Sequence, residues 1–305
     1  MGDNIRRVLI TGATGLLGRP VFKACTAIGD WQVRGTAFQR AGQAFTKVDL
    51  SSVKTIAPVL DTLQPETIIH CAAERRPDVS EKDPAGTRRL NVEATATIAA
   101  WAKRNGCYLI YMSSDYVFDG SHPPYTPASP TCPINTYGQS KLDGEHVVQE
   151  SGALAALLRV PLLYGAVEYL GESAVTVIAQ NMLNAQATGQ TLLMDDWAIR
   201  YPTFTEDVAV VLRQMVEHSF SKGPLTGIYQ WSNTEAMTKY EIALAFAKVI
   251  DFPAAQLVPE KVPAADAAPR PKDCHLDSSL LESLGIGQRT PFAKTIPAIL
   301  QPFIT

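Results

Sequence analysis

A tyrosine stands four residues before a lysine in the stretch "INTYGQSKLD", residues 134–143. Side chains at i and i+4 lie on one face of a helix, so Tyr137 and Lys141 would be neighbours there. A phenol beside an ammonium group is a proton donor with a lowered pKa, which suits the reduction of a carbonyl. The same pair is also ordinary on an amphipathic helix. The rest of the chain has to decide between the two interpretations.

A glycine-rich segment near the start of the chain predicts a nucleotide-binding turn. The segment "TGATGLLG", residues 11–18, follows an apolar run and precedes a helical pattern. Gly12, Gly15 and Gly18 would let the backbone turn tightly and approach a pyrophosphate, which then rests on the helix N-terminus. A glycine turn without a ligand is the alternative. The position between a predicted strand and a predicted helix favours nucleotide binding.

The end of the second predicted strand, "GTAFQRAG" at 35–42, bears on the choice of cofactor. NAD sites usually place an acid there for the ribose 2′-hydroxyl, and this segment has none. Arg40, with Arg34 as a second candidate, would instead meet a 2′-phosphate, although a solvated surface arginine is the simpler interpretation. Asp49 and Leu50 follow where the third strand should end, near the adenine. The sequence therefore predicts NADP(H) rather than NAD.

Short apolar runs alternate with helical periodicity through the first half of the chain. Two of these runs are almost continuously apolar, as is typical of strands buried on both faces. The βαβα order predicts an α/β fold with a Rossmann-type doubly wound parallel sheet and right-handed crossovers. The predicted strands are Val8–Thr11, Gln32–Phe38, Thr67–Ala73 and Tyr108–Ser114, and the predicted helices are Leu16–Ile28, Val53–Leu63 and Leu90–Lys103.

The alternation loosens after the apolar run at Leu157–Tyr164. Thr203–His218 predicts one more helix of the first layer and Gly227–Ser232 one more strand, while the proline-rich segments 121–133 and 262–271 predict loops. We expect a smaller C-terminal lobe interleaved with the sheet domain. The expected division is 1–165 for an NADP-binding Rossmann domain, with 201–232 returning to it, and 166–200 with 233–305 for a lobe that meets a substrate or partner.

Composition narrows the classes of protein. The chain has 305 residues, 46% of them hydrophobic, a net charge of −3, and no apolar run long enough to cross a bilayer. These values give no support for binding to nucleic acid or to a membrane surface. The first residues lead directly into a strand pattern, so we expect no signal peptide. Five scattered cysteines without a C-x-x-C pair predict a reducing, cytoplasmic location, and the histidine spacing predicts no metal site.

Several motifs together resemble the extended short-chain dehydrogenases/reductases. They are the glycine turn, the "DL" at Asp49, the "CAA" at Cys71–Ala73, Asn91, Ser113-Ser114 and the Tyr137–Lys141 pair. Within that superfamily, the strings "SSDYVFDG" (113–120), "NTYGQSKLDGE" (135–145) and "RPKDCHLD" (270–277) are similar to the dTDP-4-dehydrorhamnose reductases.

The resemblance implies roles for individual residues. Tyr137 would donate a proton to a substrate carbonyl, Lys141 would hold the nicotinamide ribose and lower the tyrosine pKa, and Ser114 would hydrogen-bond the carbonyl oxygen. Asp115 would assist. The implied cofactor-binding residues are Gly12, Thr14, Gly15, Leu16, Leu17, Gly18, Phe38, Arg40, Asp49, Leu50, Cys71, Ala72, Ala73, Asn91, Tyr137, Lys141 and Pro161.

A closer resemblance is to the regulatory beta subunits of methionine adenosyltransferases. The strings that carry it are "HCAAERRPDV" (70–79), "ESAVTV" (172–177), "MTKYE" (237–241) and "LGIGQRTPF" (284–292). It implies an NADP-binding reductase fold that modulates S-adenosylmethionine synthesis through a catalytic subunit as partner. Rhamnose reductases carry an R-T-x-W run where this chain has "RVPL" (159–162), so the tryptophan that faces the sugar is absent.

The sequence therefore leaves two functions open. The four strings and the absent tryptophan favour a regulatory subunit. The complete set of Ser114, Tyr137 and Lys141 favours an active NADPH-dependent reductase of 4-keto-6-deoxy sugar nucleotides, as does a chain end at "QPFIT" without the basic, aromatic tail of animal beta subunits. We expect the regulatory subunit.

Further arginines have open roles: Arg75 and Arg76 would clamp a pyrophosphate or a partner carboxylate, or be solvated, and Arg200 and Arg270 would pack or face the cleft. Trp231 is predicted to lie in the core.

Overall fold

The structure is a computed structural model that describes residues 5–263 and 267–304. The first four residues, on which part of the signal-peptide prediction rests, lie outside the described residues, as do 264–266 in the predicted loop 262–271 and Thr305 at the end of the last quoted string.

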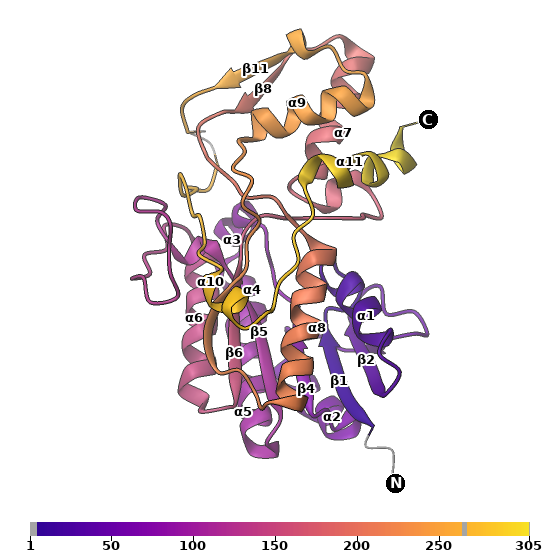
Figure 1. Ribbon diagram of the computed structural model, residues 1–305, viewed down its shortest axis with the longest axis vertical. Coiled ribbons are helices and arrows are strands. Elements are labelled where there is room, and N and C mark those ends of the chain that lie inside the picture. Colours follow the sequence, from indigo (N-terminus) through magenta and orange to yellow (C-terminus); the bar gives the residue numbers. More distant parts are fainter. Residues whose placement is uncertain (1–4, 264–266, 305) are drawn as a thin grey trace.

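A seven-stranded sheet forms the centre of the larger part of the molecule, with all neighbouring strands parallel (Figure 1). The strand order is β10-β6-β5-β4-β1-β2-β3, so the order reverses between β1 and β4. In such sheets ligands bind outside the carboxyl ends of the strands at this reversal. The predicted doubly wound fold is confirmed. The strands are β1 (Arg6–Thr11), β2 (Trp31–Ala37), β3 (Thr46–Lys47), β4 (Thr67–His70), β5 (Tyr108–Ser114), β6 (Ala155–Val160) and β10 (Gly227–Gln230).

Alternation of side chains along each strand builds a core on both faces of the sheet. In β1, Val8 and Ile10 join the core beneath α1 (Gly18–Thr26) and α8 (Thr205–Ser221), whereas Leu9 joins the core on the opposite face. That second face is covered by α2 (Val53–Leu63), α5 (Ala94–Asn105) and α6 (Thr136–Ser151). Burial on both faces explains why β4 and β5 are apolar almost without interruption.

The predicted elements end where local contacts change. β4 stops at His70, three residues before the predicted end, because Cys71–Ala73 leave the sheet and form the loop beneath the glycine turn. The predicted helix at Leu90–Lys103 begins as a π-helical turn, Arg89–Glu93, before α5. Two short helices that were not predicted precede it, α3 (Pro77–Lys82) and α4 (Pro84–Arg88), each with a proline in its first turn.

A smaller lobe with its own apolar core lies beyond the carboxyl ends of the strands (Figure 1). Met182, Phe246 and Phe292 are fully buried in this core. The lobe contains a two-stranded parallel sheet that the sequence did not predict, because runs of four residues carry too little periodicity. Its elements are α7 (Thr176–Thr188), β8 (Leu192–Asp195), α9 (Lys239–Ile250), β11 (Leu257–Glu260) and α11 (Phe292–Leu300). The pair β7 (Leu163–Tyr164) and β9 (Thr203–Phe204), together with α10 (Ser279–Ser283), completes the fold.

No helix in the described part of the chain is both long and apolar enough to cross a membrane. Within those same residues, no group of three or more His, Cys, Asp or Glu side chains is placed to hold a metal ion.

Candidate functional site

A cavity of about 610 Å³ opens at the carboxyl ends of the strands, between the sheet and the smaller lobe. Every predicted catalytic and cofactor-binding residue except Asn91 lines it. The loops after β1, β2 and β4 supply one end of the lining, and the end of β5 with the start of α6 supplies the middle. The lobe contributes Ala174, Arg200, Lys239 and Arg270. The topology therefore brings together residues that are far apart in the sequence.

The glycine turn packs so closely on its neighbours that side chains would not fit. Gly12 has a φ of +66°, and a Cβ there would lie 2.9 Å from Ala72 Cα, while a Cβ at Gly18 would lie 2.0 Å from the Gly12 carbonyl oxygen. Helix α1 begins at this turn with no acidic residue in its first turn and no side-chain cap. Neither a carboxylate nor a capping group competes with an anion for its N–H groups, so the turn suits a pyrophosphate.

The loop after β2 carries two of the predicted cofactor-binding residues, Phe38 and Arg40, and Arg40 was expected to meet a 2′-phosphate. Phe38 is half exposed and lines the cavity, as does Arg40. The guanidinium of Arg40 is paired with Glu168 and Glu172 from the segment after β7. Arg34, the second candidate for the 2′-phosphate, occupies an exposed position within β2 and does not line the cavity.

Local packing at the start of α6 brings Tyr137 to the end of β5. Asn135 caps the helix by accepting a hydrogen bond from the Gly138 N–H at 2.7 Å. A Cβ at Gly138 would lie 2.1 Å from the Tyr116 carbonyl oxygen, so only glycine permits this close approach. The Tyr116 and Tyr137 rings pack edge to face at 5.7 Å. Ser114, on the adjoining strand end, donates a hydrogen bond to Asp115 at 3.0 Å.

The electrostatics of this group differ from the expectation. Burial raises the pKa of the Tyr137 hydroxyl, and the nearby Ser114 hydroxyl opposes the shift only in part. The net shift of this pKa is therefore upward, opposite in direction to the lowering that was expected. Burial also lowers the pKa of Lys141 to about 7, against the attraction of Glu145. Its ammonium group lies 4.2 Å from the centre of the Tyr111 ring, a cation–π contact. Asp115 has a pKa raised to about 6 by burial, with Arg200 opposing.

Asn91 is the one predicted cofactor-binding residue that the structure places outside the cavity lining. Its side chain is fully buried and donates to the Glu74 carbonyl oxygen and to Ser140, both at 2.9 Å. Its carbonyl oxygen accepts from the Glu74 N–H at 2.8 Å. These bonds use most of its capacity, so Asn91 joins the loop after β4 to α6.

A buried ion pair behind Lys141 was not predicted. Glu145 and Arg159 are 1% and 2% exposed and form two hydrogen bonds, at 2.8 and 2.6 Å. Ser113 donates a third hydrogen bond to Glu145 at 2.5 Å. Two signals were available in the sequence: Glu145 continues the four-residue spacing of Tyr137 and Lys141, and Arg159 interrupts the apolar run "AALLRV" of β6.

Four positive side chains besides Arg40 and Lys141 line the cavity. Arg75, Arg200 and Arg270 line it, and so does Lys239, which the sequence did not single out. Arg200 donates to the carbonyl oxygens of Ile199 and Pro271, and Arg270 pairs with Asp78 at 2.7 Å. Arg76 points elsewhere, since it is largely exposed and pairs with Glu74. Trp231 is 1% exposed in the sheet core, which confirms its predicted place.

The parallel sheet, the glycine turn and the Ser114, Tyr137 and Lys141 side chains in one cavity define the architecture of the extended short-chain dehydrogenases/reductases. Residues 6–304 match the family described as RmlD substrate binding domain, and the chain belongs to that family.

Individual relatives agree with this assignment. The chain is 47% identical over 299 residues to methionine adenosyltransferase 2 subunit beta of Mus musculus, covering 98% of this chain and 88% of that protein. A dTDP-4-dehydrorhamnose reductase of Burkholderia thailandensis is 34% identical over 161 residues, 52% of this chain and 51% of that one. The crystal structure of dTDP-4-dehydrorhamnose reductase (rfbD) from Bacillus anthracis str. Ames in complex with NADP superposes with a TM-score of 0.81 at 24% identity, covering 97% and 99% of the two chains. Both resemblances seen in the sequence are confirmed.

Proposed function

We propose that this chain is a cytoplasmic, NADP(H)-binding regulatory subunit that modulates S-adenosylmethionine synthesis by a catalytic methionine adenosyltransferase subunit. The observation that carries the proposal is the 47% identity to methionine adenosyltransferase 2 subunit beta, which extends over 98% of the chain. A match of this length includes the sheet, the cavity and the lobe, and not only the nucleotide-binding half. Segments 166–200 and 233–305, the smaller lobe, are proposed to contact the substrate or partner.

The cavity residues fit a dinucleotide cofactor. The uncapped start of α1 suits a pyrophosphate, and the Arg40 guanidinium lies at the end of β2, where a 2′-phosphate would lie. Tyr137 and Lys141 are proposed to hold the nicotinamide ribose farther along the same cavity. NADPH, when bound, supplies a hydride for the reduction of a carbonyl.

A specific observation supports a second function, the reduction of a 4-keto-6-deoxy sugar nucleotide. Ser114, Asp115, Tyr137 and Lys141 all line the cavity that would hold the cofactor. In that reaction Tyr137 donates its proton to the substrate carbonyl oxygen, and Ser114 donates a hydrogen bond to the same oxygen. A regulatory subunit descended from a reductase would also retain these residues, so their presence alone does not decide between the two functions.

One experiment with two readouts tests the proposal. The full chain is used to capture the catalytic methionine adenosyltransferase subunit of the same source, and NADPH oxidation is measured with 4-keto-6-deoxy sugar nucleotides. We expect co-purification and altered kinetics of S-adenosylmethionine synthesis. Absence of association together with rapid NADPH consumption would reject the regulatory function in favour of the reductase.

The cofactor is tested separately by calorimetric titration of NADP and NAD. We expect NADP to bind more tightly, and Arg40→Ala to remove on the order of 1–3 kcal/mol from NADP binding while NAD binding hardly changes. Equal affinity of the wild-type chain for both cofactors, with NADP binding unchanged by Arg40→Ala, would show that Arg40 does not bind the 2′-phosphate.

A further inference from the structure

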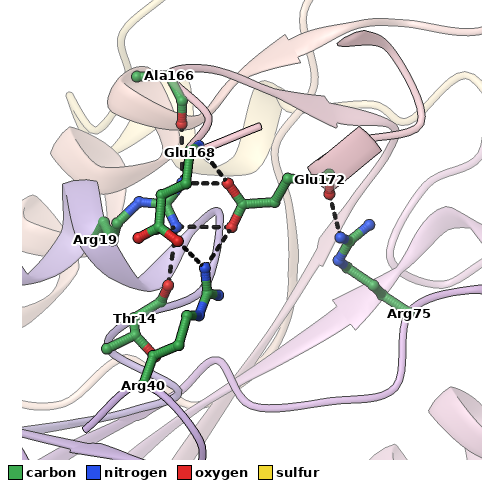
Figure 2. A network of polar contacts seen from close by, with 7 residues as sticks. All are labelled: Thr14, Arg19, Arg40, Arg75, Ala166, Glu168 and Glu172. Carbon is green, nitrogen blue, oxygen red and sulfur yellow. Dashed lines mark hydrogen bonds and ion pairs between the residues drawn. The ribbon is translucent and has the colours of Figure 1, made fainter. Parts of the chain in front are cut away.

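The segment 166–172, which enters the smaller lobe after β7, is held by arginines from three different parts of the sheet domain (Figure 2). Arg19 comes from the start of α1, Arg40 from the loop after β2, and Arg75 from the loop after β4. All three parts lie at the carboxyl edge of the sheet, beside the proposed adenosine end of the cavity. The contacts therefore fall where the cofactor phosphates are proposed to lie.

Glu172 is the fixed centre of this network. Both of its carboxylate oxygens accept from the Arg19 guanidinium, at 2.7 and 2.8 Å, and one also accepts the Glu168 N–H at 2.9 Å. The side chain is 3% exposed. Burial alone would raise the pKa of Glu172, but the hydrogen bonds from Arg19 and from the Glu168 N–H outweigh it and lower the pKa to about 2. The Glu172 carbonyl oxygen accepts a further bond from Arg75.

Glu168 has a looser position in the same network. Its side chain is 50% exposed, and its carboxylate pairs with Arg40, whose side chain is 42% exposed. Arg40 also reaches Glu172 at 3.2 Å, and Arg19 lies 3.6 Å from Glu168. Figure 2 shows contacts from Arg40 to both Glu168 and Glu172, while the bidentate pair joins Glu172 to Arg19 without Glu168. Glu168 can therefore leave Arg40 without breaking the bidentate Arg19–Glu172 pair.

We propose that Glu168 is a specificity-determining residue that competes with the 2′-phosphate of NADP(H) for Arg40. This inference rests on the proposed binding of a dinucleotide in the cavity. A carboxylate and a phosphate on one guanidinium repel each other, so entry of the phosphate exchanges the Arg40–Glu168 pair for an Arg40–phosphate pair.

The same exchange affects the choice between cofactors. NAD presents a ribose 2′-hydroxyl, which an acid accepts as a hydrogen-bond donor, and the end of β2 has no acid. Glu168 supplies a carboxylate beside Arg40 from a segment far along the chain. Glu168 thus weakens NADP(H) binding and does not weaken NAD(H) binding. The ratio of the affinity for NADP to the affinity for NAD is therefore smaller than Arg40 would give without Glu168.

The test is calorimetric titration of NADP and NAD into the full chain and its Glu168→Gln and Glu168→Ala variants. Gln keeps the shape and removes the charge, and Ala provides a second variant that lacks the amide. An exposed pair of this kind alters affinity by about threefold. We expect both variants to bind NADP about threefold more tightly, with NAD binding unchanged or weaker. Glu150→Gln, at an exposed glutamate of α6, is the matched control for a change in net charge.

A double-mutant cycle with Arg40→Ala separates competition for Arg40 from a general change in potential. We expect the gain from Glu168→Gln to vanish in the Arg40→Ala background. Unchanged or weaker NADP binding by both Glu168 variants would overturn the inference, as would an equal gain for NAD or for Glu150→Gln. If the wild-type chain binds neither cofactor, or shows no preference that depends on Arg40, the proposed cofactor itself fails. The two failures are therefore distinguishable.

Discussion

Tyr137 and Lys141 share one face of α6, yet their side chains meet different surroundings. The phenol packs on Tyr116 beside Ser114, whereas the ammonium group lies over the Tyr111 ring near the buried Glu145. Because its pKa is lowered to about 7, Lys141 is partly neutral at neutral pH. A bound ribose and diphosphate would place hydroxyls and negative charge near it. We therefore expect cofactor binding to raise the pKa of Lys141 and to keep it charged, as proton donation by Tyr137 requires.

Substitution of these two residues separates proton donation from cofactor binding. If the chain reduces a keto sugar, Tyr137→Phe should lower turnover by about 10²–10⁴-fold and leave NADPH binding nearly intact, because only the proton donor is lost. Lys141→Ala should reduce both quantities. NADPH oxidation gives the turnover and calorimetry the affinity. An active Tyr137→Phe variant would show that a different group donates the proton, and Asp115 in the same cavity is a candidate.

The sequence identified most residues of the site because their motifs are local. "TGATGLLG" and the four-residue spacing of Tyr137 and Lys141 are visible without knowing any distant contact. Glu168 and Lys239 were missed because only the fold brings Glu168 to Arg40 and Lys239 to the cavity. The rise in the pKa of Tyr137 was missed for a related reason: burial dominates it, and the extent of burial is a property of the whole site.

At the scale of elements, His70 joins three parts of the sheet domain. It lies at the end of β4, and its imidazole is hydrogen-bonded to Thr11 of β1 at 2.7 Å and to Thr95 of α5 at 3.1 Å. The ring is 1% exposed. Burial, with a smaller contribution from Lys141, lowers the pKa of His70 to about 3. The folded state therefore holds His70 neutral.

This burial predicts a pH dependence of stability. Since the folded-state pKa lies below the unfolded value near 6.5, the stability due to neutral His70 is complete above about pH 6.5. It is lost as the pH falls towards 3, by about 1.4 kcal/mol per pH unit. Asp115, whose pKa is raised, titrates with the opposite sign, so the measurement compares wild type with His70→Gln, in which the Asp115 contribution cancels. The free energy of urea unfolding of the wild type, minus that of the variant, should decrease between pH 7 and pH 5. A difference independent of pH would contradict the assignment.

Elements were predictable where a pattern of adequate length is local. The sheet strands β1, β2, β4 and β5 and the helix α2 follow from apolar runs and periodicity. The pair β8 and β11 has four residues in each strand, and the segment between the two strands includes α8, β10 and α9. Such pairing depends on the tertiary core around Phe246 and Met182 rather than on any signal in the strands.

At the scale of the molecule, the two parts are joined by contacts away from the cavity as well as around it. Thr290, just before α11, donates to Asp207 of α8 at 2.6 and 2.8 Å. Tyr164 and Thr295 share a buried hydrogen bond of 2.9 Å between β7 and α11. The Arg19–Glu172 pair adds a bidentate bond between α1 and the entry to the lobe. Unfolding of the sheet domain would leave the lobe's hydrogen-bonding and charged groups without their partners, so we expect the two parts to unfold together.

Cooperative unfolding predicts how a cofactor acts on the whole chain. The cavity is lined by both parts, so NADPH bound there should stabilise them equally. At about 100 times its dissociation constant, it should add about 2.7 kcal/mol to the free energy of unfolding. Scanning calorimetry should show a single transition, with equal calorimetric and van't Hoff enthalpies, that shifts upward as one peak when NADPH is added. Tryptophan fluorescence offers a local check, because Trp101 lies in the sheet core and Trp197 in the segment that follows β8. Two unfolding transitions would contradict this prediction if NADPH raised the temperature only of the one reported by Trp101. The lobe would then unfold independently of the cofactor site.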